Sequence, residues 1–211
     1  MGKASQGVFG GWTNKVGNVV GRFRGGVNIY SIYQPNVSNP KTTAQKQGRR
    51  IFTMCTQFLS KVGQIASIGF KNQKSGNYWM GEGIKANYGD AVTGSWPSYV
   101  LNFAKLLVSK GNLDNPYAPS CSAQGTDLTF SWTDNSGIGN ALDTDLIGIA
   151  VYNKDKDEAV CDSASAPRSA RTGSFSTPSA WTGDKVEVYL MAHRADDSMV
   201  STSLFLGEFT L

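Results

Sequence analysis

The spacing of apolar residues along the chain changes twice. Over residues 12–33, β-branched and aromatic residues alternate with glycines, which predicts two or three short strands with glycine turns near residues 10–11, 17–18 and 25–26. Over residues 51–66 the apolar positions recur every three or four residues, which predicts one buried stripe on an amphipathic helix. From residue 128 onward, runs such as DLTFSW alternate apolar and polar residues, as half-buried strands do.

The amphipathic helix is expected to run from residue 43 to residue 66. Asn39 and Pro40 end an extended segment before it, and Thr42 followed three residues later by Gln45 fits a capping box. Gly48 departs from the helical pattern, since glycine costs about 1 kcal/mol inside a helix. The expected buried positions share 3–4 spacing: Ile51, Met54, Cys55, Phe58, Leu59, Val62, Ile65 and Ala66.

The rest of the chain reads as short elements. The stretch NYWMGEGIKANYGDAV predicts a short helix weakened by glycines, and WPSYVLNFAKLLVSKG predicts one or two strands that end at Gly111. Beyond it, six or seven strands separated by turn residues predict an immunoglobulin- or fibronectin-like β-sandwich. Val186, Val188, Leu190 and Ala192 are expected to face its core. The expected class is α+β: N-terminal glycine-rich hairpins, one long helix and a C-terminal sandwich.

The charged residues are unevenly distributed along the chain. Only 17% of the 211 residues are charged, and the net charge is +4. Through residue 110, however, there are fourteen Lys and Arg and two acids, a net charge of +12, whereas residues 111–211 have six cations and fourteen acids, a net charge of −8. The segment GNLDNPYAPS, residues 111–120, contains the turn residues at which the sign changes. We therefore predict a basic module, 1–110, and an acidic module, 111–211.

Five cations of the basic module are candidates for contact with a polyanion or an acidic protein surface. Arg22 and Arg24 would share one face of a strand. Lys46 and Arg50 would share one helix face, with Arg49 near its edge and no acid within a turn. Cations are unfavourable near a helix N-terminus, so this cluster is more readily explained by a partner than by folding. The alternative for both groups is an ordinary solvated surface.

No pattern of reactive residues is present. Cys55, Cys121 and Cys161 are scattered, which argues against disulfides and a thiolate metal site. The carboxylate-rich loops lack the spacing of a calcium-binding EF-hand loop. His193 is the single histidine, and its neighbours indicate an exposed strand end. We therefore predict no enzymatic activity, no cofactor and no metal site.

Neither a membrane span nor a secretory signal is expected. No window approaches the ~18 consecutive apolar residues of a transmembrane helix, and the N-terminal segment has no continuous apolar region. The chain is thus expected to be made in the bacterial cytoplasm.

The motif N-P-K-T-x-A-Q-x-x-x-R-x-x-F is carried by Asn39, Pro40, Lys41, Thr42, Ala44, Gln45, Arg49 and Phe52. With GGWTNKVGNVVGR, TFSWTDNSG and VYLMAHRADD, it gives nearly the whole chain a resemblance to an uncharacterised domain family of Bacteroidota and their phages and prophages. The resemblance implies a virion or mobile-element setting and carries no catalytic residues.

These observations favour a non-enzymatic structural protein that assembles in many copies, with the basic module contacting genome or neighbouring subunits. Its expected partners are further copies or other virion proteins, with nucleic acid as a possible third partner, and its expected location is the virion. One alternative is a cytoplasmic nucleic-acid-binding protein that stacks bases on Trp12, Phe23, Tyr30 and Tyr33. Another is a carbohydrate- or receptor-binding module marked by exposed Trp96 and Trp181.

Overall fold

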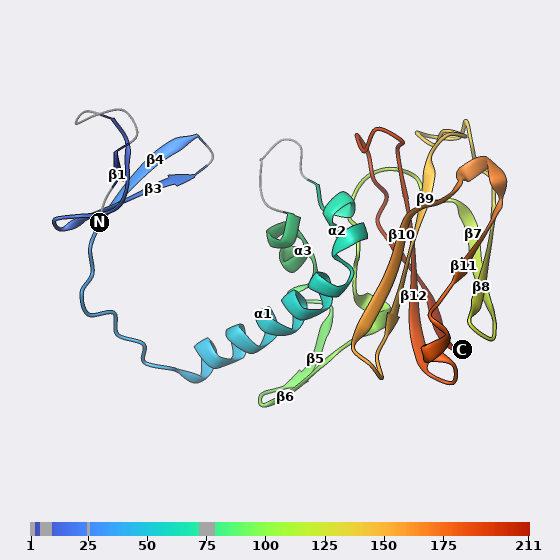
Figure 1. Cartoon of the computed structure of the whole chain (residues 1–211). Coiled ribbons are helices and arrows are strands. Elements are labelled where there is room, and N and C mark those ends of the chain that lie inside the picture. The colour runs from blue at the N-terminus through green and yellow to red at the C-terminus, as the bar shows by residue number, and fades with distance from the viewer. Residues whose placement is uncertain (1–2, 5–9, 25, 72–78) are drawn as a thin grey trace. The chain divides into compact units, whose positions relative to one another are not determined.

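The fold is mixed and mostly β, with three α-helices and several antiparallel sheets among the residues that the structure describes. The computed structural model describes residues 3–4, 10–24, 26–71 and 79–211. Its contacts divide the chain into two compact units, Met1–Thr42 and Thr43–Leu211 (Figure 1). The expected combination of helices and antiparallel strands is therefore confirmed at the level of class.

The first unit is a four-stranded antiparallel sheet in the order β1-β2-β3-β4. The strands are β1 (Lys3–Ala4), β2 (Trp12–Val16), β3 (Val19–Arg24) and β4 (Val27–Ile32). A short turn joins β2 to β3, and residue 25, between β3 and β4, lies outside the described residues. Sequence and register agree here, because β-branched and aromatic residues fill the strands and glycines lie at the turns.

Gly21 shows why one glycine lies inside a strand of this sheet. A Cβ at this position would lie 2.1 Å from the carbonyl oxygen of Trp12, so only glycine allows the two backbones to approach. The Trp12 ring then packs on Tyr30, the residue opposite Gly21, with ring centroids 4.3 Å apart. The lack of a side chain at Gly21 thus leaves room for the ring pair of Trp12 and Tyr30.

The second unit begins with three helices: α1 (Thr43–Lys61), α2 (Gly63–Gly69) and α3 (Trp79–Asn87). The predicted helix begins where expected, but Val62 interrupts it, so its last part is the separate helix α2. The predicted stripe is buried from Met54 onward, whereas Ile51 is half-buried. Helix α3 packs closely on α1, since a Cβ at Gly83 would lie 2.9 Å from Cδ1 of Leu59.

Strands form the remainder of the second unit. A small hairpin joins β5 (Val92–Ser95) to β6 (Ser98–Leu101). The four-stranded sheet β10-β9-β12-β13 contains Glu158–Pro167, Leu146–Asn153, Lys185–His193 and Leu204–Thr210, in that order. The three-stranded sheet β11-β8-β7 contains Thr172–Ser176, Asp127–Thr133 and Tyr117–Gln124. Single 3-10 turns lie at Phe103–Lys105, Arg168–Ala170 and Ser179–Trp181.

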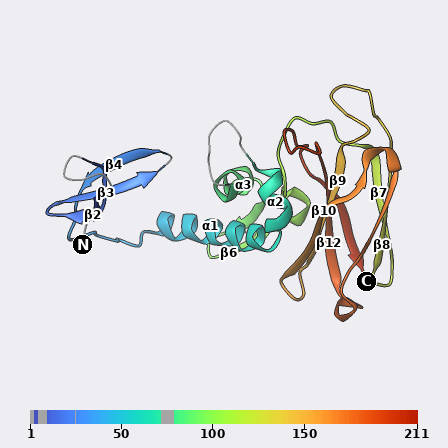
Figure 2. The same cartoon turned by 45° about the horizontal axis from the view of Figure 1, so that its top comes forward.

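Two hydrophobic cores lie on opposite faces of the four-stranded sheet. One lies between the two sheets and includes Phe130 of β8 and the four predicted core residues of β12, from Val186 to Ala192. The other lies between the helices and the outer face of the sheet, where Phe58 of α1 packs edge-on against Tyr152 and Tyr189. The helices therefore form a third layer on the sheet pair (Figure 2).

The contacts divide the chain at a different place from the charge. The charge pattern predicts a boundary at residues 110–111, but the helices of residues 43–87 share a core with strands of residues 146–193. Apolar residues from both sides of residue 110 pack into one core. The net charge of a segment does not report that packing, because most charged residues lie at the surface. The compact unit starts at Thr43 instead.

Candidate polyanion and subunit-contact surfaces

One face of the first unit's sheet carries its cations. Arg22 and Arg24 alternate with Phe23 along β3, and both arginine side chains are exposed. Lys15 of β2 pairs with the residue two positions before Arg22, so it lies on the same face. The Nζ atom of Lys15 lies 3.5 Å from the centroid of the Tyr33 ring, a cation–π contact. We call Lys15, Arg22 and Arg24 the basic face.

The opposite face of the same sheet carries no charged side chain among those that the structure describes. Strand register and the ring contact of Trp12 with Tyr30 place six large apolar side chains there. We call this set the neutral face: Trp12, Val16, Val19, Phe23, Tyr30 and Ile32. Two of them are largely in solvent, Phe23 at 62% exposure and Ile32 at 76%.

The other predicted cations lie at the start of α1. This helix is buried only from Met54 onward, so Lys46, Arg49 and Arg50 precede the part that packs on the core, and all three are exposed. Among the described residues, no carboxylate forms an ion pair with Lys46 or Arg50. The first turn of the helix holds no acid either. The start of α1 is thus a positively charged, exposed surface.

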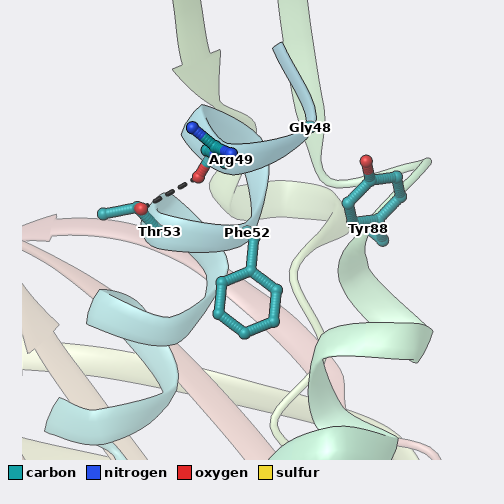
Figure 3. A pocket seen from close by; sticks show the side chains of 5 residues that line it. All are labelled: Gly48, Arg49, Phe52, Thr53 and Tyr88. Atoms are coloured by element: carbon teal, nitrogen blue, oxygen red, sulfur yellow. Dashed lines mark hydrogen bonds between the residues drawn. The ribbon is translucent and has the colours of Figure 1, made fainter. Parts of the chain in front are cut away.

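Arg49 lines a pocket together with two aromatic residues. An open pocket of about 470 Å³ is lined by Gly48, Arg49, Phe52, Thr53 and Tyr88 (Figure 3). Phe52 is 51% and Tyr88 is 43% exposed. The hydroxyl of Thr53 donates a hydrogen bond of 2.8 Å to the carbonyl oxygen of Arg49, so it is engaged with the helix. A pocket lined by an arginine and exposed aromatic residues suits planar or anionic groups.

The five predicted contact residues are divided between the two structural units. Arg22 and Arg24 belong to the first unit, and Lys46, Arg49 and Arg50 belong to the second. The predicted sharing of a strand face by Arg22 and Arg24 agrees with the strand register. The sequence analysis did not include Lys15 among the candidate cations, although its position next to Val16 in a strand places it on the opposite face from that apolar residue. It also did not predict that Phe52 and Tyr88 line one pocket.

Part of the positive charge of residues 43–110 is neutralised within the second unit. Nζ of Lys61 lies 3.4 Å from a carboxylate oxygen of Asp157, and Nζ of Lys71 lies 3.7 Å from one of Asp197. Both pairs join a cation of the predicted basic module to an acid of the acidic module. Within the part of the chain that the structure describes, Lys15, Arg22 and Arg24 of the basic face and Lys46 and Arg50 of α1 form no such pair.

Carboxylates of the sandwich are also occupied locally. Asp184 pairs with Lys156, and Glu208 pairs with Lys154 and Lys185. The hydrogen bonds from Lys154 and Lys185 lower the pKa of Glu208 to about 2. Asp196 accepts hydrogen bonds from its own turn, which lower its pKa as well. These acids serve the fold of their own unit.

A fully buried ion pair anchors the loops at one end of the sandwich. Arg168 and Asp145 are each 0% exposed, with Nη2 of Arg168 3.1 Å from Oδ2 of Asp145. The guanidinium also donates 2.8 Å hydrogen bonds to Oδ1 of Asn135 and to the carbonyl oxygen of Asp114. No sequence pattern predicted this network, in which the buried guanidinium is paired with a buried carboxylate.

The remaining candidate reactive groups are built into the fold. His193 is buried at 3% exposure, so the prediction of an exposed strand end is wrong. Its Nε2 lies 2.7 Å from the carbonyl oxygen of Ser163, because β12 lies in the middle of the sheet and the ring turns inward. Burial raises the pKa of the Cys121 and Cys161 thiols to about 12, which disfavours their nucleophilic form.

Two further classes of feature are not found in the described part of the chain. It contains no group of three or more His, Cys, Asp or Glu placed to hold a metal ion. Within the same residues no helix is long and apolar enough to span a membrane.

The comparison with protein families gives one match. A model described as a family of unknown function (DUF6266) covers residues 8–207. The chain belongs to this family. The match includes residues of both structural units. No curated protein and no solved structure matches the chain.

Proposed function

We propose that this member of the family is a non-enzymatic structural protein that assembles in multiple copies and whose N-terminal region contacts nucleic acid. One observation carries the proposal. The first 81 residues contain eleven Lys and Arg and no acid, and the cations of the basic face and of the α1 start are exposed. Such a density of positive charge favours a polyanion by release of counterions.

A neighbouring subunit is the other contact considered for these cations. Contact with the acidic sandwich of a second copy would also be electrostatically favourable, since residues 111–211 have a net charge of −8. Two of those acids, Asp157 and Asp197, already pair with Lys61 and Lys71 of the same unit, which lie outside residues 111–211. The local pairing reduces the attraction that the sandwich offers to another copy and favours nucleic acid as the partner.

The sandwich is proposed as a packing or display module of immunoglobulin or fibronectin type. Its four-stranded and three-stranded antiparallel sheets around one core are the supporting observation. The resemblance of the sequence motif to phage and prophage proteins supports a virion or mobile-element setting.

Reversing Arg49 and Arg50 to Glu tests the contact at α1. Both side chains are exposed, so the double variant is expected to fold and to lose nucleic-acid retention and assembly into larger particles. Lys105 and Lys110, which are also exposed, give a matched control when both are changed to Glu. Electron microscopy and the ratio of absorbance at 260 to 280 nm measure the two effects. Unchanged particles and unchanged nucleic acid in the Arg49→Glu/Arg50→Glu protein would refute the proposal.

A nucleic-acid-binding protein without a structural role is the second candidate. Phe52 and Tyr88 beside Arg49 favour it, because exposed rings stack bases and an arginine binds phosphate. The logarithm of the binding constant for single-stranded DNA should then fall linearly with the logarithm of the salt concentration. The slope should be about −0.7 for each phosphate contact. Binding that does not change with salt would discard this candidate. Of the two tryptophans that marked the carbohydrate- or receptor-binding alternative, Trp181 is buried at 2% exposure and Trp96 is 38% exposed, so only Trp96 still supports it.

A further inference from the structure

The first unit has almost no core of its own. Among its residues whose side chains are described, only Gly21 is buried. A sheet with an apolar face has to cover that face with another layer, and a chain of about 40 residues usually needs a disulfide, a metal or association. Residues 1–42 contain no Cys, His, Asp or Glu, which removes disulfides and metal sites. The routes that remain are association with another copy and packing against another part of the same chain.

The neutral face is large enough to matter for association. The exposed fractions are 49% for Val16, 62% for Phe23, 43% for Tyr30 and 76% for Ile32. With about 150–250 Å² for each large side chain, these fractions leave roughly 400 Å² of apolar surface in water. Monomeric proteins rarely leave a larger continuous apolar patch exposed.

We propose that two copies of the chain pack the neutral faces of their first units against each other. The inference rests on the multi-copy assembly proposed above and assigns its contact. A two-fold pair places the same uncharged face on both sides, so its apolar residues are complementary by symmetry. The four side chains of each copy together bury roughly 800 Å² in the pair. This is about two thirds of the ~1,200 Å² of small specific interfaces, and the backbone and the remaining side chains of the face add to it.

Charge favours the face-to-face orientation over other orientations of two first units. Two units that each carry five cations and no acid repel each other in most orientations. Face-to-face packing directs Arg22 and Arg24 of each copy outward, on opposite sides of two sheets that lie about 10 Å apart. Solvent and salt screen charges at that separation. The pair then presents a basic face on each side and binds a polyanion at two places.

Ile32 and Ile29 provide a matched test within one strand. Both are exposed residues of β4, but Ile32 lies on the neutral face and Ile29 lies opposite Arg22 on the basic face. The full chain is changed to Ile32→Lys or to Ile29→Lys. Molar mass is measured by light scattering and analytical ultracentrifugation after nuclease treatment, over a range of concentrations.

The expected result is that Ile32→Lys weakens association by about a hundredfold or more, because the two-fold axis introduces each change twice. The expected mass of Ile29→Lys is that of the unchanged protein. If the unchanged protein is an oligomer and neither substitution affects its mass, the neutral-face contact is refuted while multi-copy assembly stands. A single-chain mass for the unchanged protein at every concentration refutes both, and it indicates that another part of the same chain covers the face. The circular dichroism spectra of both variants should match that of the unchanged protein, because Ile29 and Ile32 are exposed in the single chain.

Discussion

Substituting Arg168 by Met is expected to destabilise the second unit strongly. The guanidinium is fully buried and makes hydrogen bonds to Asn135, to the backbone of Asp114 and to Asp145. Met fills similar space but leaves the buried carboxylate of Asp145 without its main counter-charge. Removing one partner of a buried ion pair costs about 3–5 kcal/mol. At about 2–4 °C for each kcal/mol in a unit of this size, the melting temperature should fall by roughly 10 °C.

Urea unfolding monitored by tryptophan fluorescence measures this change, because Trp132 and Trp181 lie in the sandwich core. Arg171→Met is the control, since Arg171 is exposed and its loss should change stability by no more than about 0.5 kcal/mol. The double variant Asp145→Asn/Arg168→Met should regain much of the loss, because no charge remains buried. A loss below about 1 kcal/mol in Arg168→Met, or no recovery in the double variant, would refute the reasoning.

Three further outcomes follow from the second unit. Phe58→Ala should lower the free energy of unfolding by about 3–5 kcal/mol in the same urea assay, because this ring joins the helices to the sheet; an effect below 1 kcal/mol would mean that the helices pack independently. The lowered pKa of Glu208, about 2 in the folded state, predicts a stabilising contribution that is present above pH ~4.5 and lost as the pH falls through about 2; thermal melts of Glu208→Gln should therefore show a flatter acid limb than the unchanged protein. Cys121 and Cys161, with thiol pKa values raised to about 12, should resist iodoacetamide at pH 8 in the folded chain and react in urea, as mass spectrometry would show.

Local patterns predicted the elements well. The alternation in DLTFSW placed Leu128, Phe130 and Trp132 on one face, and all three lie in the core between the sheets. The 3–4 spacing of residues 51–66 likewise predicted the buried stripe of the first two helices. These patterns succeed because each reports one face of one element in contact with a core.

The third layer was missed, although the sequence carried a signal for it. Strands β9 and β12 are buried on both faces, and the run LIGIAVYN is apolar at successive positions rather than alternating. A continuous apolar run indicates a strand covered on two sides. The covering helices lie in the basic part of the chain, so the change of charge sign at residue 110 obscured the shared core.

The contact surfaces were predicted in part for a similar reason. Alternation along β3 was sufficient to place Arg22 and Arg24 together. The pocket of Arg49, Phe52 and Tyr88 depends on how α3 packs on α1, and no local pattern encodes that packing. The exposure of Phe23 and Ile32 was equally hidden, because an apolar residue in a strand is ordinarily read as core.

Multi-copy assembly through the N-terminal region is tested most directly by the molar mass of the full chain in solution. Size-exclusion chromatography with light scattering, run with and without nuclease, separates protein contacts from contacts through nucleic acid. A mass of two or more 22.7 kDa chains that persists after nuclease is the expected result, with a larger particle before treatment. A mass of 22.7 kDa after nuclease, at every concentration, would contradict the account.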